Sequence, residues 1–306
     1  MSDPTELVLT TSYLAALGLF AAAAISRKLL VKKTTPETPA GSVPETEDSP
    51  YQPPLAGDLP PPLPSGKVPT WFYQPFDLLG LSMIYLVFFA LVLSSVRASH
   101  KADLVLDPRA LLVSIGFQFA IAGIVAFIVT RRAHVIDWLG LRWRSWPWVF
   151  LIAPGTVAVM WLFFGTLQAT GYMKWMESLG VESVQDTVKL LQTSRDPLIL
   201  GLMAFAAVLA APVCEEIVFR GYFYPAAKRF AGPWVAGIFS AIVFASAHGS
   251  LSALLPLFIF GCVLVFIYEK TGSLWAPIAV HFCFNGATVL VQMITRVYHL
   301  PLDSVQ

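Results

Sequence analysis

Apolar residues in this chain occur in long unbroken runs rather than in alternation with polar ones. A helix that crosses a bilayer needs roughly 20 such residues, whereas the strands of a membrane barrel would alternate apolar and polar positions. The runs cover residues 7–26, 76–96, 110–130, 147–169, 197–218, 233–248, 251–268 and 274–295. The sixth and seventh are short and suit tilted or re-entrant helices. The pattern therefore predicts an all-α polytopic membrane protein, a bundle of about eight transmembrane helices.

Composition supports a bilayer environment. The chain is 56% hydrophobic and 13% charged, with a mean hydropathy of +0.68, whereas soluble domains carry about 25% charged residues. We therefore expect an integral membrane protein with the lipid bilayer as a partner. The net charge of +1 gives no reason to expect a nucleic-acid partner. Cys214, Cys262 and Cys283 lie in or beside apolar runs without zinc-site spacing, which is typical of reduced, buried cysteines.

Composition also divides the chain into five segments. Residues 1–33 form a transmembrane anchor, because "MSDPTEL" lacks the basic start of a signal peptide and "RKLLVKK" follows the apolar run. Residues 34–70 hold eleven of the 23 prolines together with several acidic residues, a composition that predicts a disordered linker. Residues 71–196 are the first helices of the bundle, 197–296 the last helices, and 297–306 a tail.

Positive charges predict the orientation. With the N-terminus outside, 13 of the 20 Lys and Arg residues fall on the inner side and 7 on the outer side. The aromatic stretch "WLGLRWRSWPW" at 138–148 suits the inner interface. We find no convincing internal repeat, which argues against an inverted-repeat transporter.

Three polar clusters interrupt the last apolar runs. They are "EEIVFR" with Glu215, Glu216 and Arg220, "FASAH" with Phe244 and His248, and "HFCFN" with His281 and Asn285. Residues four apart share a helix face, so Glu216 and Arg220 can form an ion pair, whereas Glu215 points about 100° away. Ionisable side chains within a membrane indicate a functional site by default.

Spacing also predicts the depth of these side chains. "AGPW" at 231–234 is the expected turn between two helices, with Glu215 and His248 each about 16 residues from it, and so at one level. His281 is only about 10 residues past its own turn, which places it nearer the inner side unless helices tilt or bend.

The residue types suit hydrolysis of an amide bond. Glutamate with histidine can deprotonate water, and histidine with asparagine can donate to an oxyanion. Two histidines and a glutamate could instead bind zinc, although the helical His-Glu-x-x-His arrangement is absent. Structural interpretations also stand: a polar helix cap at the glutamates, an interfacial histidine at His248, and interhelical hydrogen bonds at His281 and Asn285.

The three motifs, in this order, resemble the CAAX-processing and bacteriocin-processing membrane proteases, also called the CPBP or Abi family. The resemblance covers residues 197–296. It implies an intramembrane glutamate protease, an eight-helix bundle with a conical intramembrane cavity open to the cytosol, and a bacterial plasma-membrane location. It also implies that the substrate is a membrane-associated protein or peptide, such as a lipidated CAAX protein.

The resemblance further implies a role for each motif residue. Glu215 and His248 activate water, and His281 and Asn285 form the oxyanion hole. Glu216, Arg220 and Phe244 support them. No cofactor is expected, with zinc as the alternative. A non-catalytic adaptor or immunity protein with the same fold, and a proton-coupled transporter, are alternative functions. The oligomeric state is left open.

Overall fold

The computed structural model describes residues 4–34, 67–99, 107–141, 143–181 and 191–298. Within these ranges every regular element is a helix and none is a strand, as the sequence predicts. Most of the expected linker, at residues 35–66, and the end of the tail from residue 299 lie outside the described ranges. The segment boundaries inferred from composition therefore stay predictions.

The described parts of the first half of the chain contain four long helices and three short elements. They are α1 (Pro4–Thr34), α2 (Asp77–Ser99), α3 (Pro108–Thr130), α4 (Val135–Trp138), the 3₁₀ turn η1 (Trp146–Trp148), α5 (Val149–Ala169) and α6 (Tyr172–Ser178).

The second half begins with a single helical run of 35 residues. This run consists of α8 (Pro197–Phe205), the π-helical η2 (Ala206–Ala210), α9 (Ala211–Glu215), the π-helical η3 (Glu216–Phe223) and α10 (Tyr224–Ala231). It is followed by α11 (Pro233–Ser246), α12 (Leu251–Thr271) and α13 (Trp275–Val297).

Seven of the described helical segments are long and apolar enough to cross a membrane, and α11, with 14 residues, is a shorter apolar helix beside them. This agrees with the expected bundle of about eight helices. Two bounds differ from the prediction. The fifth span continues to Ala231 instead of ending at residue 218, and α12 has 21 residues, so the seventh span is not short. The expected turn is present at Gly232.

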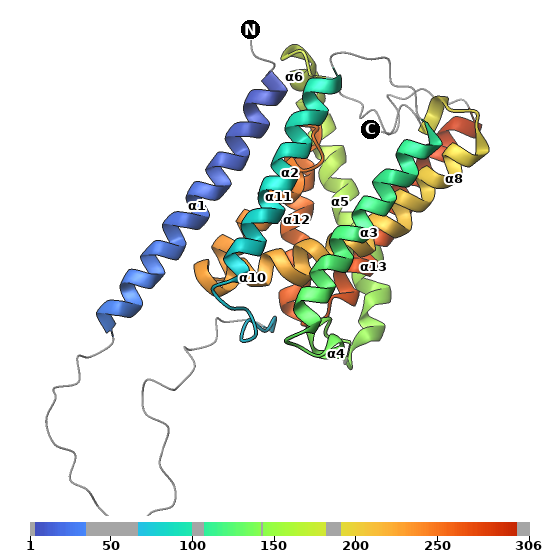
Figure 1. Cartoon of the computed structure of the whole chain (residues 1–306). Helices are drawn as coiled ribbons and strands as arrows, with labels where there is room; N and C mark the ends of the chain where they lie inside the picture. Colours follow the sequence, from blue (N-terminus) through green and yellow to red (C-terminus); the bar gives the residue numbers. More distant parts are fainter. Residues whose placement is uncertain (1–3, 35–66, 100–106, 142, 182–190, 299–306) are drawn as a thin grey trace, which may run out of the picture.

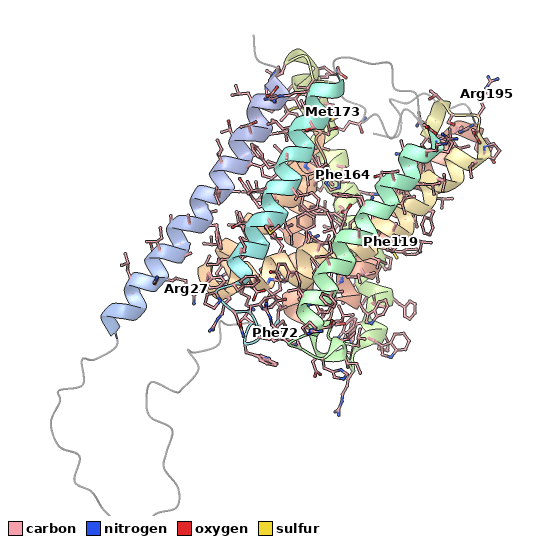
Figure 2. The ribbon with its side chains drawn as sticks, in the orientation of Figure 1. Arg27, Phe72, Phe119, Phe164, Met173 and Arg195 are labelled. Carbon is pink, nitrogen blue, oxygen red and sulfur yellow. The ribbon has the colours of Figure 1, made fainter. Side chains whose placement is uncertain are left out.

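The bundle has two distinct ends (Figure 1). The short helix α6 lies at the same end as the N-terminus, and α4 and α10 lie at the opposite end. Figure 2 shows Arg27 and Phe72 at the α4 end, with Met173 and Arg195 at the α6 end. Helix α1 stands at the flank of the bundle and packs on α11 and α10.

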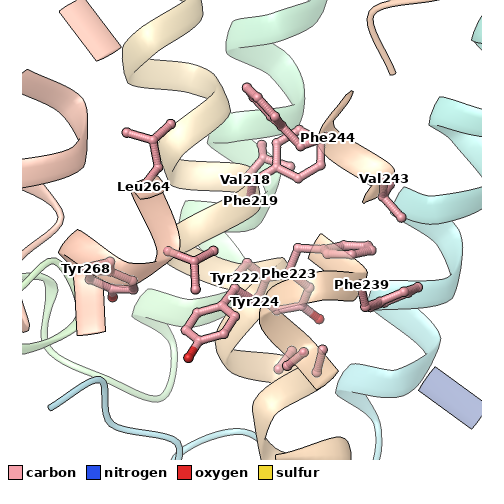
Figure 3. Packing of buried hydrophobic residues seen from close by; sticks show 14 of the residues in the cluster. Val218, Phe219, Tyr222, Phe223, Tyr224, Phe239, Val243, Phe244, Leu264 and Tyr268 are labelled. Atoms are coloured by element: carbon pink, nitrogen blue, oxygen red, sulfur yellow. The ribbon is translucent and has the colours of Figure 1, made fainter. Parts of the chain in front are cut away.

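The centre of the bundle is formed by η3, α10, α11 and α12. Aromatic rings from these elements interlock, and Phe219 stacks edge-on against Phe244 while Phe223 lies flat against Phe239 (Figure 3). Phe223, Phe239 and Phe244 are completely buried. By contrast, only 11% of the most apolar stretch of Trp146–Ala169, which includes α5, is buried. The central helices therefore form a protein core, whereas α5 presents most of its surface outward, as a lipid-facing helix does.

Candidate functional site

Two prolines distort the helical run that carries the candidate glutamates. Pro212 and Pro225 have no backbone N–H, so each removes a hydrogen bond from the helix. The run widens into π-helical turns beside them: Ala211 N–H bonds to the Ala206 carbonyl, and Tyr224 N–H bonds to the Phe219 carbonyl. Such turns free backbone carbonyl groups and frequently mark functional sites.

The first freed carbonyl belongs to Ala207. Its donor four residues on, Ala211, already bonds to Ala206, and the residue five on is Pro212, which has no donor. Asn285 supplies the missing hydrogen bond from α13, with Nδ2 2.8 Å from the Ala207 oxygen. Asn285 therefore ties α13 to the glutamate-bearing run while keeping a second N–H available.

Glu216, Arg220 and His281 form a buried cluster, which we call the site cluster. Arg220 Nη1 donates to Glu216 Oε1 at 2.9 Å, and His281 Nδ1 lies 2.9 Å from the same oxygen. Glu216 and Arg220 are completely buried and His281 is 3% exposed. Removing one partner of such a buried pair costs about 3–5 kcal/mol, because the other charge is left without compensation.

Close packing of α11 against α12 completes the surroundings of Arg220. A Cβ atom on Gly261 would lie 3.1 Å from both Ala241 Cα and Cβ, so glycine lets the two helices approach. The carbonyl of Gly261 accepts a hydrogen bond from Arg220 Nη2 at 3.2 Å. Arg220 is thus held by a carboxylate and a main-chain oxygen.

Phe244 brings the two histidines into one neighbourhood. Its ring centroid lies 4.9 Å from that of His248 and 6.0 Å from that of His281, and Arg220 Cζ lies 4.4 Å from it. His248 Nδ1 is 2.8 Å from the Phe244 carbonyl oxygen. Because a carbonyl only accepts, Nδ1 carries the proton and, in the neutral imidazole, Nε2 keeps its lone pair. His248 itself is exposed.

Glu215 has a buried oxygen without a hydrogen-bond partner. Its Oε2 is inaccessible and unpaired, and so are Glu216 Oε2 and Arg220 Nε. A buried polar atom left unpaired costs about 1–3 kcal/mol, and more when it is charged. Three such atoms in one site indicate a place for water or for a polar group of a ligand.

Some of the predicted contacts are present and others are not. The Glu216–Arg220 ion pair is confirmed. His281 contacts Glu216, the residue directly after Glu215. The depth expected for His281 in the membrane stays a prediction. Among the described side chains, no hydrogen bond or ion pair joins Glu215 to His248. The catalytic roles and the conical cavity stay predictions.

A metal site is not evident in the described parts of the chain. No group of three or more His, Cys, Asp or Glu side chains in them is arranged to hold a metal ion. Glu216 and His281 come close enough to share an ion, but Arg220 occupies the position beside the carboxylate. These residues therefore do not fit a zinc ion, and we derive no chemistry from one.

Sequence reasoning missed the residues that brace the site from the first half of the chain. Buried Asp77 accepts hydrogen bonds from Tyr222 at 3.0 Å and from Arg132 at 2.7 Å, which links η3 to α2 and the end of α3. Tyr73 and Trp138 both donate to the Gly221 carbonyl. One signal was readable: Pro225 stands four residues after Gly221 and cannot satisfy that carbonyl.

Residues 197–287 match the model of a protein family described as "Type II CAAX prenyl endopeptidase Rce1-like". The predicted resemblance is confirmed for this segment. A stretch of 92 residues is also 30% identical to a Bacillus subtilis (strain 168) protein named "Putative membrane peptidase YdiL". That stretch covers 30% of this chain and 38% of the relative. No solved structure matches the chain significantly. The matched family is a protease family, and all the candidate residues lie within 197–287.

Proposed function

We propose that this protein is an intramembrane endopeptidase that hydrolyses a peptide bond in a membrane-associated protein or peptide. The observation that carries the proposal is the unpaired, buried Oε2 of Glu215 beside the site cluster. Its neighbour Glu216 has its charge compensated by Arg220, whereas Glu215 has a carboxylate free to accept a proton. The match of residues 197–287 to a protease family supports the same chemistry.

In the proposed mechanism, Glu215 is the general base for a water molecule. His248 can orient that water, because its Nδ1 is committed to the Phe244 carbonyl and its Nε2 accepts. The hydroxide adds to the carbonyl carbon of the substrate and the proton moves to Glu215. When the C–N bond breaks, Glu215 returns the proton to the leaving nitrogen, which yields a carboxylic acid and an amine.

His281 and Asn285 are the proposed donors to the developing oxyanion. The second N–H of Asn285 Nδ2 remains after its bond to Ala207. His281 holds one proton on Nδ1, which faces Glu216, so its Nε2 donates only when the ring carries both protons. Glu216 orients the His281 ring through this contact, as well as pairing with Arg220.

The proposal is tested on purified protein in lipid nanodiscs with a fluorogenic lipidated CAAX-like peptide. We expect Glu215→Gln and His248→Gln each to lower turnover by about 10²–10⁴-fold, the usual contribution of general acid–base groups. Glu6→Gln is the matched control, because Glu6 pairs with exposed Arg97 far along the chain. Cleavage that survives in both site variants would refute the mechanism.

Substrate identity requires a second experiment in cells. We expect new protein termini from membrane-associated proteins in cells with the wild-type chain, and their absence with Glu215→Gln. Termini that do not depend on Glu215, combined with an intact cellular phenotype in that variant, would favour a non-catalytic adaptor. A zinc chelator should leave peptide cleavage unchanged; loss of cleavage that added zinc restores would identify a metallopeptidase instead.

A further inference from the structure

The C-terminal end of α4 contacts both helices that carry the site cluster. Trp138 Nε1 donates to the Gly221 carbonyl at 2.7 Å, and the Leu139 carbonyl accepts from Leu274 N–H at 2.9 Å. Gly221 belongs to η3, which holds Glu216 and Arg220, and Leu274 is the first residue before α13, which holds His281. Two adjacent residues at the end of α4 thus hold the two helices that carry the cluster.

The Gly221 carbonyl lacks its α-helical donor and accepts from two side chains instead. In an α-helix it would accept from residue 225, which is proline and has no N–H. Tyr73 fills the position together with Trp138, with its hydroxyl 2.6 Å from the same oxygen. Both side chains are buried, at 2% and 3% exposure. Burial raises the pKa of Tyr73 well above its ordinary value of 10.0, so the phenol keeps the proton that it donates.

The turn that follows α4 fits tightly against the α12–α13 connection. Gly140 has a φ of 62°, and a Cβ atom there would lie 2.0 Å from the Gly272 carbonyl oxygen. Any other residue would push the turn away from residues 272–274, and with it the hydrogen bond between Leu139 and Leu274. The contact is therefore specific to this backbone geometry.

We propose that Trp138 and Tyr73 are positioning residues, which hold the Gly221 carbonyl and so fix the helix turn that presents Glu215 and Glu216. This inference rests on the proposed function for its effect on turnover, but not for its effect on structure. Both residues lie outside the family segment 197–287. The proposal therefore assigns part of the catalytic geometry to the first half of the chain.

The test removes the two donors singly and together. Tyr73→Phe and Trp138→Phe each leave one donor, so we expect a fall in kcat of about 3-fold for each. The double variant leaves a buried carbonyl without a donor, and we expect kcat to fall about 10- to 100-fold with KM within about 2-fold. Tyr85→Phe is the matched control, because it also removes a buried tyrosine bond to a carbonyl, that of Tyr13.

Hydrogen–deuterium exchange provides a readout that does not depend on activity. In the double variant we expect faster exchange of amides in residues 216–226. In Tyr85→Phe exchange should change only in α1 and α2. Adding Pro225→Ala to the double variant restores an N–H that can reach Gly221, so it should slow exchange again and recover part of kcat. Pro225→Ala alone should change little, because the carbonyl is already occupied.

The outcomes separate this inference from the proposed function. If the wild type cleaves nothing, the proposed function fails, and exchange in residues 216–226 still decides the inference. If the double variant does not fold, each single variant is measured with and without Pro225→Ala. Exchange in residues 216–226 and kcat are then compared as for the double variant. Exchange and kcat like those of Tyr85→Phe, with no rescue by Pro225→Ala, would overturn the proposal.

Discussion

Two buried ionic clusters lie along the same helical run, and they differ in how completely their polar atoms are satisfied. The site cluster leaves Glu216 Oε2 and Arg220 Nε unpaired, next to the unpaired Glu215 Oε2. The second cluster, which we call the basal cluster, consists of Tyr224, Lys228 and Glu269.

In the basal cluster nearly every polar group has a partner. Lys228 is completely buried and donates to Glu269 and to the Val68 carbonyl, and Tyr224 donates to Glu269 at 2.6 Å. Only Glu269 Oε2 lacks a partner among its oxygens. Val68 lies near the start of the described range 67–99, so the cluster fastens the start of that range to α10 and α12. The basal cluster therefore has one unpaired atom, whereas the site cluster has two, and the adjacent Glu215 adds a third. This difference agrees with the proposal that the site cluster lies at the ligand-binding site.

The largest expected effect follows from breaking the site cluster. Glu216→Ala leaves Arg220 buried without its carboxylate, which should lower the free energy of unfolding by about 3–5 kcal/mol. It should also abolish turnover, because His281 loses the acceptor that orients it. Denaturant unfolding in detergent and the peptide assay measure the two effects. An unchanged unfolding midpoint would mean that the pair adds nothing to the fold.

A smaller effect on stability is expected when both members of an ion pair are replaced by apolar residues. Doing this in each cluster compares the two clusters directly. Buried pairs replaced in this way are often neutral or stabilising. We expect Lys228→Met with Glu269→Leu to keep turnover within about 3-fold of wild type. Glu216→Leu with Arg220→Met should recover stability but not turnover. If both double variants were active, turnover would not require the site cluster, and the proposed difference between the two clusters would be wrong.

The smallest effect on stability and turnover is expected at the exposed ion pair between Glu6 of α1 and Arg97 of α2. Arg97 and Glu6 form a hydrogen-bonded ion pair at 2.6 Å, but the Arg97 side chain is 62% exposed. Exposed pairs contribute little to stability, since water screens them. Arg97→Gln should leave the unfolding midpoint and turnover unchanged. A clear loss of either would mean that α1 packing contributes to the site.

The local sequence pattern was sufficient to predict the helices and turns, but not the contacts between helices that are far apart in the chain. The apolar runs predicted the helices, "AGPW" predicted the turn at Gly232, and the four-residue spacing predicted the Glu216–Arg220 pair. Each of these features depends on residues a few positions apart. The bonds from His281 to Glu216, from Trp138 to Gly221 and from Tyr73 to Gly221 join residues 65, 83 and 148 positions apart. No periodicity encodes such contacts. Pro225 marked the vacant carbonyl, but it did not reveal which side chains would fill it.

The central claim is that adjacent glutamates have different tasks: Glu216 holds the fold together and Glu215 performs the chemistry. The most direct test measures turnover and the unfolding midpoint of Glu215→Gln in one preparation. The account predicts a fall in kcat of about 10²–10⁴-fold with an unfolding midpoint like that of wild type. Turnover within about 10-fold of wild type, or a midpoint lowered as much as in Glu216→Ala, would contradict it.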